Sequence, residues 1–525
     1  MSHKKSVAAI LLSTTVLGVP AHAESMKRLA TVPLDAEVTG LFEVGSDLFF
    51  NIQHPNKEIG NEFAKAAVGV IANADWDAAA MEPTTEDADK KVVRSSLGDY
   101  QVLLQEGDEG IVGVIKSLAG EDLLVSNDPD FNAYVPTGDN EGYLFTNWEN
   151  RPGGMSRAKI MRAEDGTWSV DTSDLIMIDF SAVDGTLVNC FGTLSPWGTP
   201  LTSEELYFDD TVDWNNPEYK YIDDNQVLAN YLGEGKYPNP YDYGYIVEIT
   251  DPAGAATPVK HMALGRFSHE NAVVMPDNKT VYLSDDGSSV VFFKFVADAE
   301  NDLSAGTLYA AKVTQEAGAQ ADAATTGFGI EWIELGHASN DEIAAWVAEY
   351  DGIDLEDHVP GETNYITDEE VAAFAAGEAA DARVAFLESR RAAVALGATG
   401  EFNKMEGVNI NYDAAKDGSV PFMYMAMSDV SKAMSDGEGA IDVAENVCGV
   451  VYEMELDANY DVSMMVPVVA GYGYDKDAEA NACPMDSVAN PDNILVRANG
   501  QVVIGEDSGN HENNVIWLWN RDSQS

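Results

Sequence analysis

Basic residues are scarce in this 525-residue chain: 30 Lys and Arg stand against 89 Asp and Glu, which gives a formal net charge of −59. A surface this negative repels nucleic acid and anionic membranes, so we expect neither as a partner. It suits salt-rich surroundings or bound divalent cations, which relieve the self-repulsion. Because 45% of the residues are hydrophobic, the charge does not indicate disorder.

Long apolar runs are also missing. No stretch reaches the ~18 consecutive apolar residues of a membrane-spanning helix. The apolar run at residues 7–19 is too short, follows two lysines and precedes the small-x-small sequence Ala-His-Ala at residues 21–23. This pattern predicts a signal peptide over residues 1–23 and a mature chain of residues 24–525 that is exported to the periplasm or the extracellular space. A lysine pair in place of an arginine pair favours the general secretory route.

Cysteine is limited to three residues, Cys190, Cys448 and Cys483. In an oxidising compartment two of them tend to pair, and we predict a disulfide between Cys448 and Cys483, which lie close in sequence. The remaining Cys190 is either buried and inert or a metal ligand. Spacing alone favours the inert alternative.

Short apolar runs recur between turn residues along almost the whole chain. Examples are DLFFNI, QVLLQE, YLFTNW, LIMIDF, YGYIVEIT, TVYLS, VVFFKFV, FMYMAM, VCGVVYEMEL, QVVIGE and NVIWLWN. Runs bounded by Gly, Pro, Asn or Asp are typical of strands in all-β proteins. They are too many for one flat sheet or an ordinary sandwich. Small sheets arranged radially, as in a β-propeller, solve that problem.

A weak repeat supports this interpretation. Three segments, which begin at His269, Met405 and Pro491, each read as an acid, a strand, a turn, a second strand and another acid. The runs YLFTNW and GTPLTS also lead into acids, at Glu149 and at residues 204–205. Because corresponding strand ends of different blades meet around one axis, these acids are expected to face each other although they lie far apart in sequence.

One segment breaks the β pattern. Residues 340–398 are rich in Ala and Glu, a capping box begins at Thr367, and Gly397 is a plausible end. We predict helices inserted between two blades, and helices nowhere else. Their simplest role is packing without chemistry.

Clustered carboxylates stay ionised only with cations between them. Oxygen-rich clusters suit Ca²⁺, whereas a thiolate suits a softer ion such as iron or zinc. Cys190 lies close before Glu205 in NCFGTLSPWGTPLTSEE, and a strand and a tight turn there would bring the two together. Neighbouring metal ions can activate an oxygen for attack on phosphorus. From the pattern alone this is one hypothesis among several, because Asp is common in turns.

Five segments of the chain resemble the PhoX-type alkaline phosphatase family and follow the family's order. They are NCFGTLSPWGTPLTSEE (189–205), GRFSHENAVV (265–274), VYLSDDGS (281–288), FLESRRAAVALGAT followed by FNKMEGVN (386–409) and PDNILVRANGQVVIGED (491–507). With GSDLFFNIQHP near Gly45 they span almost the whole mature chain, and SPWGTPLTSEE and FSHE are the most specific.

The resemblance implies a six-bladed β-propeller with inserted helices and a secreted phosphatase that releases phosphate from small-molecule phosphate monoesters. It also implies a mixed cofactor of Fe³⁺ and Ca²⁺ ions. We expect the protein to be a monomer. The family's thiolate ligand falls on Cys190, which makes this residue a ligand and not an inert thiol. The implied carboxylate ligands are Glu205, Glu270 and Glu406, extended to Asp285, Asp286, Asp492, Glu506 and Asp507.

Lys404 stands two positions before Glu406, where the resemblance implies a phosphate-binding arginine. Lysine keeps the charge but lacks the bidentate fork of arginine. We expect Cys190, Glu205, Glu270 and Glu406 to converge, with Lys404 at the rim. Two alternatives remain open: a phosphodiesterase on the same metals, and a calcium-stabilised propeller that binds without catalysis.

Overall fold

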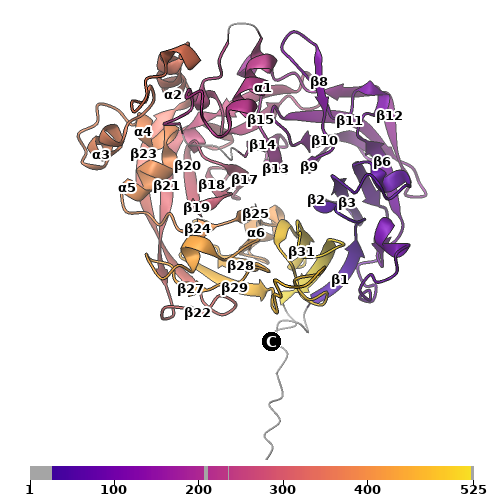
Figure 1. Cartoon of the computed structure of the whole chain (residues 1–525). Coiled ribbons are helices and arrows are strands. Elements are labelled where there is room, and N and C mark those ends of the chain that lie inside the picture. The colour runs from indigo at the N-terminus through magenta and orange to yellow at the C-terminus, as the bar shows by residue number, and fades with distance from the viewer. Residues whose placement is uncertain (1–25, 206–210, 234–235, 522–525) are drawn as a thin grey trace, which may run out of the picture.

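The computed structural model describes residues 26–205, 211–233 and 236–521, so the predicted signal peptide lies outside the described residues. Strands are the predominant regular structure, in sheets arranged around a common centre (Figure 1). Three sheets have four strands each: β2 (Glu37–Val44), β3 (Asp47–Gln53), β4 (Ala67–Ile71) and β6 (Tyr100–Gln105); β9 (Pro129–Gly138), β10 (Glu141–Trp148), β11 (Gly154–Arg162) and β12 (Trp168–Met177); β13 (Asn189–Leu194), β14 (Pro200–Glu204), β15 (Ile246–Thr250) and β16 (Thr257–His261).

Two larger sheets complete the circle. One has nine strands in the order β17 (His269–Val274), β18 (Thr280–Asp285), β20 (Phe293–Ala299), β21 (Asp302–Gln315), β23 (Phe328–Ser339), β29 (Met464–Ala470), β28 (Val450–Glu455), β26 (Phe422–Met427) and β25 (Met405–Asn409). The other has five, β30 (Pro491–Val496), β31 (Gln501–Glu506), β32 (Val515–Asn520), β1 (Met26–Thr31) and β5 (Arg94–Ser95). The predicted all-β class and strand-rich pattern are confirmed.

The circle is closed by pairing between the two ends of the described chain. β1 runs antiparallel to β32, from Met26 opposite Trp519 to Thr31 opposite Val515. Nearer the centre, β2, β9, β13, β17, β25 and β30 each contact the next, and β30 contacts β2. The first strands of the sheets therefore form a ring, so their N-terminal residues are brought together.

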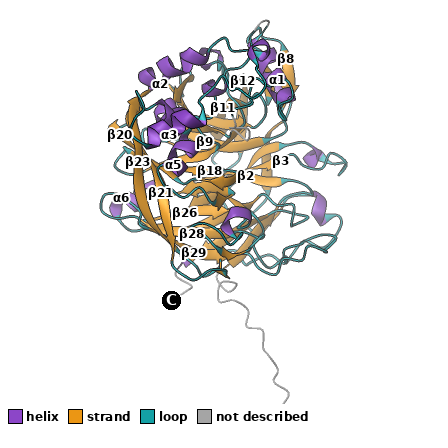
Figure 2. Ribbon diagram, turned by 60° about the vertical axis from the view of Figure 1, so that its left-hand side comes forward, coloured by secondary structure: helices purple, strands orange, loops and turns teal. Residues whose placement is uncertain are grey.

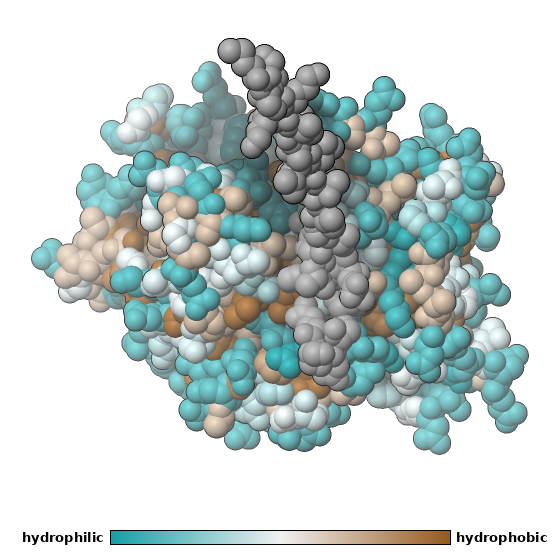
Figure 3. Space-filling model, turned by 90° about the horizontal axis from the view of Figure 1, so that it is seen from below, coloured by the Kyte–Doolittle hydropathy of each residue, from teal (hydrophilic) through white to brown (hydrophobic). Residues whose placement is uncertain are grey.

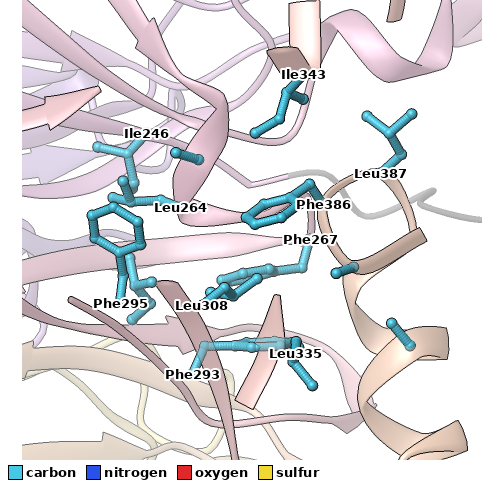
Figure 4. Close-up of a cluster of buried hydrophobic side chains, with 14 of the residues drawn as sticks. Ile246, Leu264, Phe267, Phe293, Phe295, Leu308, Leu335, Ile343, Phe386 and Leu387 are labelled. Atoms are coloured by element: carbon cyan, nitrogen blue, oxygen red, sulfur yellow. The ribbon is translucent and has the colours of Figure 1, made fainter. Parts of the chain in front are cut away.

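Four helices occupy the predicted insertion: α2 (Asn340–Val347), α3 (Asp368–Ala375), α4 (Arg383–Leu387) and α5 (Ser389–Ala395). The capping box at Thr367 is confirmed, because its side chain accepts from the Glu370 N–H and the Glu370 carboxylate accepts from the Thr367 N–H. Figure 2 shows these helices gathered on one side of the strands. Their anchor is a buried core in which Phe386 and Leu387 pack with Phe267, Leu308 and Leu335 (Figure 4).

The prediction that helices occur only in residues 340–398 is wrong. α1 (Ile222–Leu232) and α6 (Tyr412–Asp417) lie outside that segment. Tertiary packing explains α1, since Leu228 and Tyr231 are buried although the helix lacks a side-chain N-cap. Local capping explains α6, which begins after the Asn411 cap and ends at Gly418 in the left-handed region.

The predicted disulfide is confirmed: Cys448 and Cys483 are bonded, with their Cα atoms 6.0 Å apart, and Cys190 is a free, buried cysteine. Among the described residues, no helix combines the length and apolar character needed to cross a membrane. Figure 3 shows hydrophilic side chains spread widely over one face of the molecule.

Candidate metal centre

A β-bulge recurs at the start of several inner strands. In β13 the first residue, Asn189, pairs with Glu204 of β14, and the next pair is Gly192 with Thr202. Between these pairs, two residues of β13 oppose a single residue of β14. The same shift occurs where β9 meets β10, β17 meets β18, β25 meets β26 and β30 meets β31. A bulge re-aims the side chain of the extra residue. The second residues of these strands are Asp130, Cys190, Glu270, Glu406 and Asp492.

A second set follows the outer partner of each pair. In each of these strand pairs, one residue follows directly after the end of the outer strand. For β10, β14, β18, β26 and β31 these residues are Glu149, Glu205, Asp286, Ser428 and Asp507, respectively. Ser428 donates to Glu406 Oε1 at 2.6 Å, which ties the two sets together at one strand pair. The same backbone irregularity therefore delivers potential ligands from several sheets to one place.

Cys190 is at the middle of the resulting cluster. Its Sγ lies 3.2 Å from Asp130 Oδ2 and 3.4 Å from Glu270 Oε2. One ligand atom from each of Cys190, Glu205 and Glu270 lies within 4.8 Å of the others, and the same holds for Asp130, Glu149 and Cys190. The thiol thus belongs to two overlapping groups of potential ligands.

Burial makes this cluster electrostatically unfavourable without cations. Burial and then neighbouring carboxylates raise the pKa values of Asp130, Cys190, Glu205, Glu270 and Asp492 well above normal. The same causes raise the pKa values of Glu149 and Glu406 to about 7. Bound cations would reverse these shifts, because they favour the charged forms.

The oxygens of the cluster fit a metal site. Both carboxylate oxygens of Glu205, Oε1 of Glu270, Oδ1 of Asp130 and Oδ1 of Asp286 are buried and have no hydrogen-bond partner among the described residues. Glu205 and Glu270 are only 1% and 2% exposed, so bulk water does not replace the missing partners. Unsatisfied buried carboxylates are costly, and hard cations satisfy them. A thiolate beside them adds a ligand suited to iron or zinc.

Lys404 supplies positive charge beside the cluster. Its Nζ lies 2.6 Å from Asp286 Oδ2 and 3.2 Å from Glu406 Oε1, and its side chain is 33% exposed. Burial alone would raise the pKa of Asp286, but the charge of Lys404, together with hydrogen bonds from Lys404, Glu205 and the Gly287 backbone, lowers it. The lysine therefore faces the carboxylates on one side and solvent on the other, as expected for a residue at the rim.

The structure brings together most of the residues singled out from the sequence. Cys190, Glu205, Glu270, Asp286 and Glu406 meet through the contacts above. Asp492 and Asp507 join them, since the charges of both act on Glu406 or on its neighbours.

Asp285 and Glu506 require a correction. Asp285 accepts from Arg390 and from the Val291 N–H, and Glu506 accepts from Ala489, Val515, Trp517 and His511. These partners occupy the two strand-end carboxylates, whereas Asp286, just after the end of β18, binds Lys404 beside the cluster. We remove Asp285 and Glu506 from the candidate ligands.

Sequence reasoning missed Asp130 as a ligand and left Glu149 without a role. A signal was present, because Pro129-Asp130 at the start of one strand matches Pro491-Asp492 at the start of another. Glu37 at the start of β2 was missed entirely. Burial and the charge of Asp507 raise its pKa, which places it beside the same cluster.

The Glu506–His511 pair gives a testable pH dependence. Burial alone would lower the pKa of His511, but Glu506 Oε2, 2.9 Å from its Nδ1, outweighs burial and raises it. The pair therefore stabilises the fold fully below the unfolded pKa of about 6.5, and this contribution is lost as pH rises through the higher folded value. His511→Gln should cost about 1 kcal/mol in urea unfolding near pH 6 and less near pH 9. An equal cost at both values would contradict the assignment.

The fold resembles that of a solved structure over nearly the full chain. The Pseudomonas fluorescens PhoX structure in complex with vanadate, described as a transition state analogue, matches with 17% identity and a TM-score of 0.53, over 94% of this chain and 89% of that one. Two structures described as putative 6-phosphogluconolactonases also match. The one from Bacteroides uniformis has 9% identity and a TM-score of 0.26, over 91% of this chain and 89% of that one, and the one from Bacteroides fragilis has 11% identity and a TM-score of 0.27, over 93% and 89%. Both match too weakly to support an argument.

No curated protein matched the chain. The fold of the Pseudomonas protein is shared across nearly the full length of both chains. The model of the family described as alkaline phosphatase PhoX matches residues 163–522, which is more than half of the sequence. This chain belongs to the PhoX alkaline phosphatase family.

Proposed function

We propose that this protein is an exported, metal-dependent phosphatase that hydrolyses small-molecule phosphate monoesters. Family membership supports phosphatase chemistry, and the Pseudomonas relative binds vanadate. The observation that carries the proposal is the buried group of Cys190 and carboxylates, several of whose oxygens lack a hydrogen-bond partner among the described residues. The Cys448–Cys483 disulfide and the N-terminal signal pattern support export, because disulfides persist in oxidising compartments.

The donor set suits iron and calcium. Cys190 with Glu205 and Glu270, and Cys190 with Asp130 and Glu149, would hold iron, since each group combines a thiolate with carboxylates. Glu406, Asp492, Asp286 and Asp507 offer oxygen alone and would hold calcium. When bound, these metals supply the positive charge that draws in the phosphate and the Lewis acidity that activates water.

Lys404 would bind the phosphate. Its side chain is partly exposed and its ammonium lies at the edge of the carboxylates, so an entering phosphate would meet Lys404 before the buried ligands. It would stabilise charge that develops on the phosphate oxygens during P–O cleavage. Asp286 and Glu406 hold the ammonium in place for this role. As a lysine it contributes a point charge, without the paired donors of an arginine.

We also propose that the fold is a six-bladed propeller that forms one domain over residues 24–525, and that the protein acts as a monomer. The nine-stranded sheet would count as two blades, β17–β23 and β25–β29. Within the sheet they are joined where Phe328 and Gly329 of β23 pair with Met465 and Met464 of β29. This is a short junction for strands of their length. The ring of inner strands supports the same division.

A substrate comparison tests the function. Purified protein supplied with iron and calcium should release p-nitrophenol from p-nitrophenyl phosphate at alkaline pH and should lose this activity after chelation. Bis(p-nitrophenyl) phosphate should be hydrolysed much more slowly. Faster hydrolysis of the diester would indicate a phosphodiesterase, and no hydrolysis of either would indicate a binding protein.

A further inference from the structure

The turn after β18 joins the candidate metal centre to the helical segment. Asp285 is directed to Arg390 and the Val291 N–H, whereas Asp286 is directed to Lys404 beside the cluster. The Asp286 N–H donates to Ser268 O at 2.9 Å. Asp286 and the following Gly287 both bind Lys404. Asp286 Oδ2 accepts from the Lys404 ammonium, and Gly287 O accepts from the Lys404 backbone N–H at 2.7 Å. The position of Lys404 therefore depends on this turn.

The turn has a backbone that needs external support. Gly287 has φ 134° and Lys404 has φ 52°, so both lie in the left-handed region that residues with a Cβ rarely adopt. Such conformations persist only where the surroundings hold them. The two-residue pairing of β19 (Ser288–Val290) with β24 (Phe402–Asn403) is a short ladder beside it.

Arg390 of helix α5 supplies that support. Its Nε lies 2.8 Å from Asp285 Oδ2 and 3.1 Å from Oδ1, and its Nη2 also donates to Asp285 Oδ1. The same Nη2 donates to the backbone oxygen of Asp286 at 2.9 Å. One guanidinium thus binds a side chain and the main chain of consecutive residues. Such bidentate, charge-assisted contacts fix geometry more tightly than single bonds.

Helix α5 is itself firmly placed. Ser389, the residue before Arg390, accepts from the Arg266 N–H at 3.0 Å and donates to Ala385 O at 2.8 Å. The preceding helix ends in Phe386 and Leu387, which are buried in the core of Figure 4. The guanidinium is therefore held against the sheet by a packed helix and not by a loose loop.

We propose that Arg390 is a positioning residue for phosphate binding: from the helical segment it clamps the Asp285–Asp286 turn and so fixes the Lys404 ammonium at the mouth of the metal centre. This inference rests on the proposed phosphatase function, and it gives the inserted helices a role beyond packing. Among the contacts given by the described residues, Arg390 reaches neither the Asp286 carboxylate nor Cys190, and its link to the phosphate site runs through the Asp285–Asp286 turn to Lys404.

A double-mutant cycle on metal-loaded protein tests the clamp. Inorganic phosphate is titrated calorimetrically into wild type, Arg390→Met, Lys404→Met and the double variant. Arg390→Met should weaken phosphate binding about tenfold, as expected when one charged contact is misplaced. The double variant should bind phosphate no more than about twofold more weakly than Lys404→Met alone, because the two residues act in series.

Stability is separated from positioning by a compensating variant. Arg390→Met leaves the buried Asp285 without this charge partner and is expected to lower the melting temperature. Asp285→Asn combined with Arg390→Met removes that charge and should recover much of the melting temperature, yet phosphate binding should stay about tenfold weaker. If the single variant does not fold, this combination replaces it in the cycle.

Arg391 is the matched control on the same helix. It contacts Asp368, Glu388 and the backbone of Ile366, all away from the turn. Arg391→Met should keep phosphate affinity within about twofold even where it lowers the melting temperature, since no contact of Arg391 reaches Lys404.

The outcomes are distinct. The proposed role of Arg390 would be overturned if the Asp285→Asn/Arg390→Met variant bound phosphate with wild-type affinity. It would also be overturned if the losses of affinity in the cycle were additive. Neither result would affect the proposed phosphatase function. Loss of iron from the Asp285→Asn/Arg390→Met variant would also overturn the role of Arg390, because Arg390 would then act through the metals. If metal-loaded wild type neither binds phosphate nor cleaves a monoester, the proposed function and the clamp both fail.

Discussion

Cys190→Ala should lose bound iron and phosphatase activity together while the protein stays folded. The Sγ atom is shared by the group with Glu205 and Glu270 and the group with Asp130 and Glu149, so its removal breaks both. Loss of a residue that merely supports a metal ligand already costs roughly 10- to 100-fold in affinity or activity, and loss of a shared ligand should cost more than about 100-fold. Iron content by elemental analysis and the rate of p-nitrophenyl phosphate cleavage measure both effects.

The fold should survive this change because the thiol contributes little packing. The Cys448–Cys483 disulfide and the ring of inner strands are independent of it. Cooperative thermal unfolding is the control. A Cys190→Ala protein that retains full activity would show that the thiolate is not a ligand, even with the fold described here.

Lys404→Met should keep the metals and lose catalytic efficiency. Removal of the ammonium takes away a group placed to stabilise charge on phosphate oxygens, and loss of one such group typically costs about 100-fold or more in rate. Asp286 and Glu406 lose their lysine partner, but bound cations would compensate for it. The readouts are kcat/KM for p-nitrophenyl phosphate and the metal content of the same samples.

Two further variants make this prediction specific. Lys404→Arg keeps the positive charge and adds the paired N–H donors of a guanidinium, so this variant should retain most of the activity. Lys432 is the matched control, because its Nζ binds Ser288 Oγ at 2.7 Å near the same turn but not the carboxylates. Lys432→Met should leave kcat/KM nearly unchanged. Equal losses at Lys404 and Lys432 would point to a general effect of surface charge in place of a phosphate contact.

Local signals in the sequence were sufficient for the strands, the capping box at Thr367 and the Cys448–Cys483 pair, because each depends on nearby residues or on a small set of alternatives. The convergence of Cys190, Glu205, Glu270 and Glu406 needed more than local pattern. The resemblance selected these residues, and the recurrent bulge explains physically why they meet.

The remaining differences arise from backbone geometry. The sequence shows Asp285-Asp286 and Glu506-Asp507 as equivalent pairs of acids. In the structure the last residue of each strand binds Arg390 or His511, and the residue after it lies beside the cluster. Asp130 was hidden because a single Pro-Asp step is common in turns. Helix α1 was missed because burial of Leu228 and Tyr231, which sequence does not display, stabilises it.

Metal analysis of the purified wild-type protein tests the central claim most directly. The buried thiol and the unpartnered carboxylate oxygens require cations, so the protein should carry both iron and calcium, and chelation should remove them together with monoester hydrolysis. Re-addition of both metals should restore the activity. Active protein that contains neither iron nor calcium would contradict the account.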